Sequence, residues 1–502
     1  MFVLLAALLV ITYVPTVKYS ICEILRSYRI RELDDEIKWL NMNLRPGKEC
    51  ENYDDIIFLS EGLVVSDWLY FGSRTLIEGS VLSVIIFFLR ERILEKSEII
   101  AMAREYVCPG KIDTFGQIGI DLVIGKRQGP YIFDTEGKRF IDLHINGGVF
   151  NLGHRHPELI KILVSAFEEL DIGNHHFASE ARALLARKLA EKTPGDLHYT
   201  VFTSSGSEAV DIAIKTARWA TKRRQIVSLD KGYHGSTGIS GNVGDPKNID
   251  YFLSRGSKEE YAHVPFNDLP AMEKILSRKE TAAVIMETIP ATCGFPLPED
   301  GYLKAVRELC RNCGSLYIAD EIQTGLGRTG NVWGVTTFGI IPDILVTGKG
   351  LSGGVYPISA TVISKKWGGW LTENGFGHVS TFGGAEPGCH VASRVLDICS
   401  DPALLASVRK HATILGEEFS NLKSRYPFLK EIRQCGLVIG LKYDDPLGAV
   451  RMCKALYENG IWAMIAGFDY SVMQCKPWLF LDRPLIDDIL ARFEKALKIC
   501  TP

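Results

Sequence analysis

The sequence predicts an α/β fold in which a mostly parallel sheet is covered by helices on both faces. Short apolar runs of strand length alternate with segments of helical periodicity, as is typical of strand–helix–strand units. Each apolar run also ends in glycine or polar residues. Because ligands bind at the carboxyl ends of the strands in such sheets, we expect the functional residues where these runs end.

Five apolar runs are the candidate strands, and helical patterns lie between them. The runs cover residues 200–203, 226–229, 282–286, 316–319 and 344–346. Helical periodicity is clearest in residues 208–220 and 303–313. The polar ends of the runs comprise a Ser-Gly turn, a Tyr-His turn, a glutamate, an aspartate and a lysine, and we expect all of them to face one pocket.

Lys349 follows the last of these runs and lies between two glycines. Flanking glycines would leave room for a bulky group to approach the amine. A lysine at the end of a buried strand loses hydration, which lowers its pKa and makes the free amine available for Schiff-base chemistry. The alternative interpretation is an ordinary solvated charge at a strand end.

The turn Ser204-Ser205-Gly206-Ser207 opens the predicted helix 208–220. Backbone amides at a helix start, together with the positive end of the helix dipole, suit a phosphate group. The alternative is a simple helix cap made by the side chain of Ser207. Both interpretations stay open from the turn alone.

Asp320 ends a buried run, and a buried carboxylate needs a partner. The partner would be either an arginine such as Arg328 or the protonated ring nitrogen of a cofactor. In the second case Tyr233 could stack on the ring, with His234 beside it. A phosphate site, a stacking aromatic ring, a carboxylate and a strand-end lysine form the set that pyridoxal phosphate requires.

Longer motifs surround these residues in a fixed order. They occupy residues 137–143, 151–157, 205–209, 232–235, 319–330, 347–350 and 380–384. With them, the chain from about residue 110 to residue 502 resembles the class III pyridoxal-phosphate-dependent aminotransferases, of the aspartate-aminotransferase-like fold type I. The resemblance implies a large cofactor-binding domain with a mostly parallel sheet over residues 166–395. It also implies a smaller α+β domain built from residues 101–165 and 396–502, and it leaves residues 1–100 as an extra N-terminal extension.

The resemblance also implies a role for each candidate residue. Lys349 would form the Schiff base with the cofactor and move the proton, and Asp320 would pair with the ring nitrogen. The remaining cofactor-binding residues would contact the phosphate, the ring or the substrate side, and they are Ser205, Gly206, Ser207, Tyr233, His234, Glu287, Gln323 and Thr381. In the family Thr381 reaches the phosphate of the neighbouring subunit, which implies a homodimer with shared sites.

The expected reaction is the transfer of an amino group from an amine or amino acid to an aldehyde or keto acid. An aminomutase of the glutamate-semialdehyde type, an amino-acid decarboxylase and a non-catalytic scaffold are the alternatives. Phe480 stands where many family members carry a carboxylate-binding arginine. Because a three-residue shift on a strand turns a side chain to the other face, Arg483 would not replace that arginine. We therefore expect weak use of dicarboxylates, unless Arg483 or Arg328 supplies the charge.

Composition limits the other functions. The chain of 502 residues carries a net charge of −3 and has a pI near 6.4, which gives no indication of nucleic-acid binding. Its 12 cysteines show no framework spacing, so we expect no disulfide framework, no metal site and a cytoplasmic location. The apolar run at residues 1–17 would allow membrane association, although it is slightly short for a spanning helix. A second apolar run covers residues 81–89.

Overall fold

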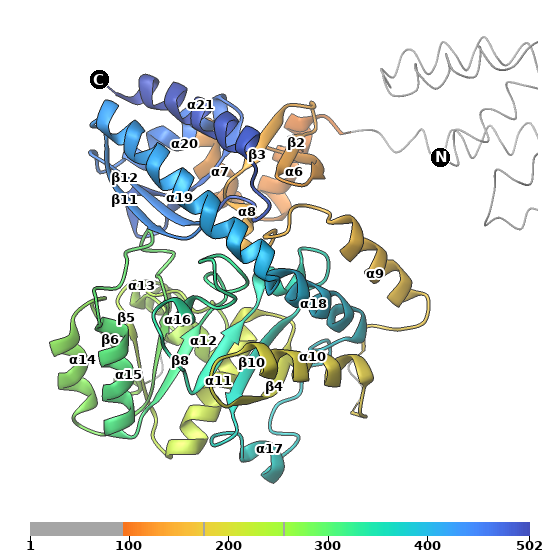
Figure 1. Cartoon of the computed structure of the whole chain (residues 1–502), viewed down its shortest axis with the longest axis vertical. Coiled ribbons are helices and arrows are strands. Elements are labelled where there is room, and N and C mark those ends of the chain that lie inside the picture. Colours follow the sequence, from red (N-terminus) through yellow and green to blue (C-terminus); the bar gives the residue numbers. More distant parts are fainter. Residues whose placement is uncertain (1–93, 174–175, 255–256, 502) are drawn as a thin grey trace, which may run out of the picture. The chain divides into compact units, whose positions relative to one another are not determined.

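The computed structural model describes residues 94–173, 176–254 and 257–501 of the chain (Figure 1). The chain divides into two units, Met1–Glu98 and Ile99–Pro502, and the features below belong to the second. The apolar runs at 1–17 and 81–89, and the membrane association predicted from them, lie outside the described residues. Within the described ranges, no helix combines the length and the apolar character needed to cross a bilayer.

A seven-stranded sheet forms the centre of this unit. Its strands lie in the order β4 (Leu197–Thr203), β10 (Ser359–Ser364), β9 (Ile344–Thr347), β8 (Leu316–Asp320), β7 (Thr281–Glu287), β5 (Gln225–Leu229) and β6 (Tyr261–Val264). Strand β10 is antiparallel to both of its neighbours, whereas β9, β8, β7, β5 and β6 pair in parallel. The predicted mostly parallel sheet is therefore confirmed, and the five predicted runs correspond to β4, β5, β7, β8 and β9.

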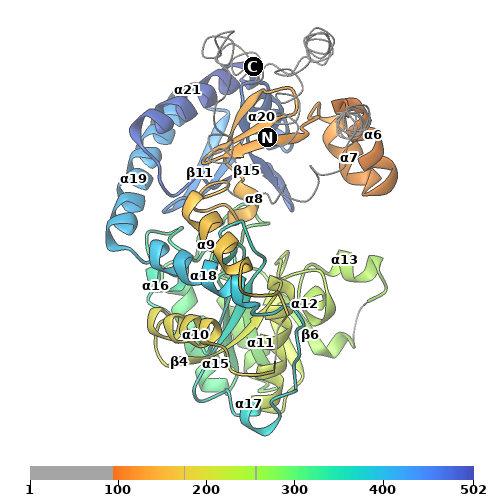
Figure 2. The same ribbon diagram turned by 90° about the vertical axis from the view of Figure 1, so that its right-hand side faces the viewer.

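Helices cover both faces of this sheet because alternate strand residues point to opposite sides. On β8, for example, Ile318 packs on the face that α11 (Gly206–Thr221) covers, while Tyr317 packs on the other. The helices on the second face are α10 (Glu180–Lys192), α14 (Leu269–Leu276), α15 (Tyr302–Cys313) and α18 (Glu386–Cys399). Figure 1 shows α14 beside α15, and Figure 2 shows α10 beside α18. Every residue of β7 and β8 is accordingly buried.

Two four-stranded sheets come from chain segments before and after the large sheet. One has the order β1 (Ile124–Gln128), β2 (Tyr131–Asp134), β3 (Arg139–Asp142) and β13 (Ile461–Trp462). The other has the order β11 (Leu429–Cys435), β12 (Val438–Tyr443), β15 (Asp469–Cys475) and β14 (Met464–Ala466). Because β3 and β13 pair in parallel, the early and late segments share one sheet. The predicted domain boundaries at residues 100, 165 and 395 stay a prediction.

The remaining helices lie before, between and after these strands in the chain. Those before and around the large sheet are α6 (Lys96–Tyr106), α7 (Pro109–Gln117), α8 (Ile145–Gly148), α9 (Pro157–Phe167), α12 (Gly238–Asn242), α13 (Pro246–Tyr251), α16 (Gly334–Thr337) and α17 (Trp370–Glu373). The C-terminal part contributes α19 (Pro402–Arg425), α20 (Gly448–Glu458) and α21 (Arg483–Cys500). Helices α20 and α21 pack against each other, and α20 also packs against β15.

The carboxyl ends of the strands fix the position of the candidate site. Strands β7, β8 and β9 are parallel neighbours, so their last residues meet at one edge of the sheet. Glu287 pairs directly with Asp320 in the register of β7 and β8. Lys349 follows β9 after one glycine. The topology therefore brings two carboxylates and one lysine to the same edge.

Candidate active site

A cavity of about 150 Å³ opens at this edge of the sheet. Its lining includes all of the predicted site residues except Ser205 and Thr381. The lining residues are Gly206, Ser207, Tyr233, His234, Gly235, Glu287, Asp320, Ile322, Gln323 and Lys349. The structure therefore brings together residues that follow or end five strands, β4, β5, β7, β8 and β9. The sequence did not predict Gly235 or Ile322 as part of the site.

Lys349 begins a short 3-10 turn (Lys349–Ser352) directly after β9, with φ at 42°. A left-handed backbone is uncommon for a residue with a side chain and is often retained at functional sites. Burial lowers the pKa of Lys349, although the carboxylates of Asp320 and Glu287 act in the opposite direction. The direction of this shift agrees with the expectation from sequence, because it makes the unprotonated amine more accessible.

The predicted reason for the two flanking glycines is wrong. A Cβ at Gly348 would lie 2.5 Å from Ser359 Oγ, and a Cβ at Gly350 would lie 2.7 Å from Asn151 Nδ2. Both positions are therefore filled by the protein itself and leave no room for a ligand. The glycines allow the turn that carries Lys349 to pack closely against its neighbours.

Asp320 is 3% exposed, and its partner is His234. His234 Nδ1 lies 2.8 Å from Asp320 Oδ2, and the Ile322 amide donates to Asp320 Oδ1 at 3.1 Å. The alternative ion pair with Arg328 is not formed. Buried Arg328 instead donates to the carbonyl oxygens of Leu437 and Pro477. Asp320 is thus held by hydrogen bonds while it lines the cavity.

Glu287 is the second carboxylate of the cavity. The amide of Ala291 donates to Glu287 Oε2 at 3.0 Å, and the amide of Tyr233 donates to Oε1 at 3.4 Å. Burial is the main cause that raises the pKa of Glu287 to about 6. The charge of His234 opposes this shift, and the charge of Asp320 adds to it. Since two carboxylates share one edge, the protonated form of Glu287 is stabilised relative to an exposed glutamate.

The Ser-Gly turn forms the start of α11. The helix cap is Ser205, whose Oγ accepts from the amide of Glu208, so the predicted cap at Ser207 is wrong. Capping occupies Ser205, whereas Gly206 and Ser207 line the cavity. Gly235, at a φ of 127°, lies so close that a Cβ there would be 2.4 Å from Ser207 Oγ. The first turn of a 16-residue helix therefore faces the cavity, as an anion site requires.

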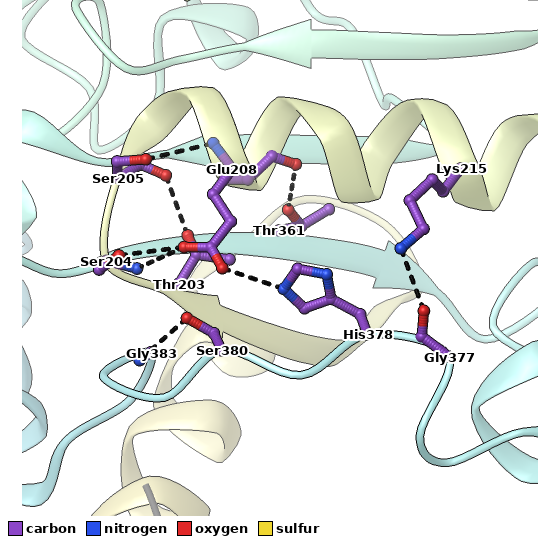
Figure 3. A network of polar contacts seen from close by, with 11 residues as sticks. Thr203, Ser204, Ser205, Glu208, Lys215, Thr361, Gly377, His378, Ser380 and Gly383 are labelled. Atoms are coloured by element: carbon purple, nitrogen blue, oxygen red, sulfur yellow. Dashed lines mark hydrogen bonds and ion pairs between the residues drawn. The ribbon is translucent and has the colours of Figure 1, made fainter. Parts of the chain in front are cut away.

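Glu208 ties this turn to the loop that carries Thr381 (Figure 3). One carboxylate oxygen accepts from the amide and hydroxyl of Ser204, and the other lies 3.1 Å from His378 Nε2. Ser380 Oγ in turn accepts from the amide of Gly383. Thr381 itself is exposed and does not line the cavity of its own chain.

A strained turn next to Lys349 was not predicted from sequence. Four consecutive residues have positive φ, Ile145, Asn146, Gly147 and Gly148, at 43°, 48°, 71° and 107°. A Cβ at Gly147 would lie 3.0 Å from Lys349 Cε and 3.3 Å from Gln323 Oε1. This turn therefore closes one side of the lysine chain, and only a residue without a side chain fits there.

The strand argument against Arg483 is wrong, because Phe480 lies in a turn and Arg483 begins α21, so neither residue is on a strand. Its ring lies 5.5 Å from that of Trp478 and 6.4 Å from that of His156. Arg483 is the first residue of α21, where it pairs with Glu418 and Asp487 at the surface. Neither residue lines the cavity of its own chain, and the replacement of an arginine by Phe480, with the weak use of dicarboxylates, stays a prediction.

The residues present fit pyridoxal phosphate. A buried carboxylate, a half-buried lysine and the start of a long helix line one cavity, and His234 Nε2 is a buried polar atom without a partner in the described residues. The class III aminotransferase family model matches residues 116–497 of the chain. This chain is a class III aminotransferase.

Its relatives agree with this assignment. An uncharacterized aminotransferase of Archaeoglobus fulgidus is 48% identical over 408 residues, which cover 81% of this chain and 95% of that protein. The putrescine aminotransferase of Pectobacterium atrosepticum is 33% identical over 424 residues, covering 80% and 88%. The solved ornithine aminotransferase of Toxoplasma gondii ME49 has a TM-score of 0.74 and 28% identity, and the match covers 83% and 98% of the two chains.

The class III aminotransferase is thus an enzyme of the aspartate-aminotransferase-like fold type I that depends on pyridoxal phosphate. It moves an amino group between a small-molecule amino donor and a carbonyl acceptor. The aminomutase, decarboxylase and scaffold alternatives are less consistent with these relatives, which carry aminotransferase names.

Proposed function

We propose that Lys349 is the catalytic lysine of this aminotransferase and that Asp320 is the partner of the cofactor ring nitrogen. Pyridoxal phosphate, when bound, supplies an aldehyde that condenses with amines and a ring that accepts electrons from the substrate carbon. The observation that carries the proposal is the cavity in which Lys349, Asp320 and the start of α11 face one another. In this arrangement the lysine, the carboxylate and the anion site can act on one bound molecule.

Lys349 would act first as the nucleophile that holds the cofactor and then as a base. Its lowered pKa favours the unprotonated amine, which can attack a carbonyl carbon and later take a proton from the substrate carbon. The turn with Gly147 restricts the chain near Cε, so Nζ is oriented and the proton moves over a short distance.

Asp320 would keep a positive charge on the ring nitrogen. A buried carboxylate stabilises a nearby cation more strongly than an exposed one does, because little water screens the charge. His234 holds Oδ2 and the Ile322 amide holds Oδ1, so the carboxylate cannot rotate freely. Tyr233, which is 42% exposed at the cavity, would stack on the ring, and Gln323 would contact its oxygen side.

The phosphate would bind at the first turn of α11, at Gly206 and Ser207. A cap that uses the side chain of Ser205 leaves the cavity side of this turn to a ligand. Thr381 would complete the phosphate site of a partner subunit, because its own cavity does not contain it. We therefore propose a homodimer with shared sites, in which the contacts of Glu208 hold the loop of Thr381 in place.

Amino transfer by the cofactor-loaded full chain tests this proposal. The protein is incubated with an isotope-labelled amino donor and a set of keto acids, and the labelled amino acid is detected by mass spectrometry. We expect transfer with the wild-type chain and loss of transfer in Lys349→Ala. Lys442→Met, which changes a lysine on β12 outside the cavity, serves as the matched control and should keep its activity.

A further inference from the structure

A second lysine, Lys476, lies fully buried directly after β15, at 0% exposure. Its amine donates to Gln474 Oε1 at 2.6 Å and lies 4.8 Å from the centre of the Phe295 ring. Its backbone amide donates to the carbonyl oxygen of Leu143 at 2.7 Å. A lysine is rarely fully buried without a paired charge, so these surroundings are unusual.

Two of the segments that hold Lys476 also form the active site. Leu143 directly precedes His144 and the strained turn whose Gly147 lies against Lys349 Cε. On the other side, Gln474 Nε2 donates to the carbonyl oxygen of Ala291, and the amide of Ala291 donates to Glu287. Lys476 therefore lies between the turn beside the catalytic lysine and the segment that follows the active-site glutamate.

No carboxylate neutralises this amine. Among the described residues, no Asp or Glu oxygen forms an ion pair with Lys476, and its hydrogen-bond acceptor is a neutral amide. Isolated charges are costly to bury, whereas a charge paired with a carboxylate is much less so. An anion that reached this amine would therefore meet a desolvated group whose hydrogen-bond acceptor, Gln474, is neutral and does not compete as a carboxylate would.

We propose that Lys476 binds a carboxylate of the amino donor or of the keto acceptor. The proposal rests on the proposed function of the neighbouring cavity and identifies the residue that selects substrates by charge. A lysine forms one charge-assisted hydrogen bond to a carboxylate, with an amine that donates in three directions. Gln474 and Phe295 occupy part of its surroundings and orient the amine.

The groups around Lys476 make its charge depend on the ligand. Burial, followed by the charges of Lys349 and Arg328, lowers its pKa to about 7, while Cys475 and Glu287 oppose the shift. Burial lowers the pKa of the neighbouring His144, and the charges of Lys476 and Lys349 lower it further. A carboxylate bound at Lys476 favours the protonated amine. Above neutral pH, binding of a carboxylate should therefore take up a proton.

Binding of unreactive ligands to the cofactor-loaded full chain tests this inference without turnover. The probes are straight-chain carboxylates from propionate to heptanoate, each compared with the alcohol of the same length. Calorimetry in two buffers of different ionisation enthalpy gives both the dissociation constant and the number of protons taken up. For the wild type we expect the carboxylates to bind more tightly than the alcohols and, at pH 8, to take up about one proton.

Two variants separate the charge of Lys476 from its packing. Lys476→Met keeps most of the side-chain volume. It should weaken carboxylate binding at least about 10-fold, abolish the proton uptake and leave alcohol binding unchanged. Gln474→Glu keeps the lysine but adds a carboxylate beside it. It should weaken binding of the same ligands, because the new carboxylate competes with them for the amine. It also tests the proposal if Lys476→Met does not fold. Lys442→Met is the matched control.

Each outcome decides the proposal. Loss of carboxylate binding in either variant, with alcohol binding retained, supports it. Carboxylate affinities that stay within about 2-fold of the wild type in the folded variants overturn it. A wild-type protein that binds carboxylates no more tightly than the matching alcohols overturns it as well. Failure of the proposed function is a separate result, because it would appear as a Lys349→Ala variant that still transfers amino groups.

Discussion

His234 Nδ1 lies 2.8 Å from Asp320 Oδ2, and both side chains are buried at the edge of the sheet. The two residues come from the turn after β5 and the end of β8, on opposite sides of β7. The second ring nitrogen of His234 has no partner in the described residues. We therefore propose that His234 positions the carboxylate of Asp320.

Replacing His234 should disturb Asp320 without removing it. His234→Phe fills the same space but cannot hydrogen-bond, so we expect kcat to fall about 10- to 100-fold. His234→Gln retains an amide donor and should recover part of the loss. In His234→Phe the visible absorption of the bound cofactor should shift with pH, which a purely structural defect would not cause. The exposed His198 gives the control, His198→Gln. Equal rates and spectra in all variants would contradict the role of His234.

Asp320→Asn removes the charge and keeps the shape. The ring nitrogen would lose the carboxylate that keeps it protonated, so turnover should fall by more than about 100-fold. Asp343→Asn is the matched control, because Asp343 is a structural carboxylate that accepts hydrogen bonds from Tyr317 and Arg307. Steady-state kinetics decide the matter. If Asp320→Asn keeps more than about a third of its activity, a loss well under 1 kcal/mol, the carboxylate is only structural.

The buried amine of Lys476 should make stability depend on pH. Burial lowers its pKa to about 7, whereas in the unfolded chain the pKa returns to the ordinary value of 10.5. Between these values the unfolded state binds one more proton than the folded state. The free energy of unfolding therefore increases as the pH rises and decreases as the pH falls toward 7. The slope contributed by this lysine is about 1.4 kcal/mol per pH unit.

Denaturant unfolding of the wild type and of Lys476→Met across this pH window measures that slope. The wild type should gain stability more steeply than the variant as the pH rises, because methionine has no proton to lose. Lys442→Met should follow the wild type. Parallel curves for all three proteins would show that the amine of Lys476 is not desolvated.

The homodimer can be tested by mixing two defective chains. Lys349→Ala lacks the lysine, and Thr381→Ala lacks the residue proposed to reach into the partner's phosphate site. If the sites are shared, a mixed dimer contains one site with both defects and one site with neither, so activity should return on mixing. Sedimentation should show a dimer in the cofactor-bound state. An active monomer, or no recovery in a mixed dimer, would contradict the shared site.

Much of the fold and site was predictable because local sequence patterns determine them. Strands β5, β7, β8 and β9 are apolar runs that end in chemically distinctive residues, so a parallel sheet places those residues at one edge. Strand β10 was not predicted because its serines and threonines give no apolar run, although all six residues are buried. Strand β6 was missed as well, because three of its four residues are only partly buried.

The missed parts of the site depend on packing between distant segments. Lys476 stands in the sequence Cys475-Lys476-Pro477-Trp478, where nothing distinguishes it from a surface lysine. Its burial arises only when the segments around Leu143 and Phe295 close over it. The same holds for the turn at Gly147, which has positive φ at four consecutive residues and packs closely against Lys349 and Gln323.

The identity of the lysine that bonds the cofactor tests the central claim most directly, since a second, fully buried lysine, Lys476, is held by segments that adjoin the site. Borohydride reduction of the cofactor-loaded full chain fixes the cofactor to the lysine that holds it, and peptide mass spectrometry then locates the modified residue. The account predicts the pyridoxyl group on Lys349 and none on Lys476. A modified Lys476, or a Lys349 that remains unmodified while the cofactor is retained, would contradict it.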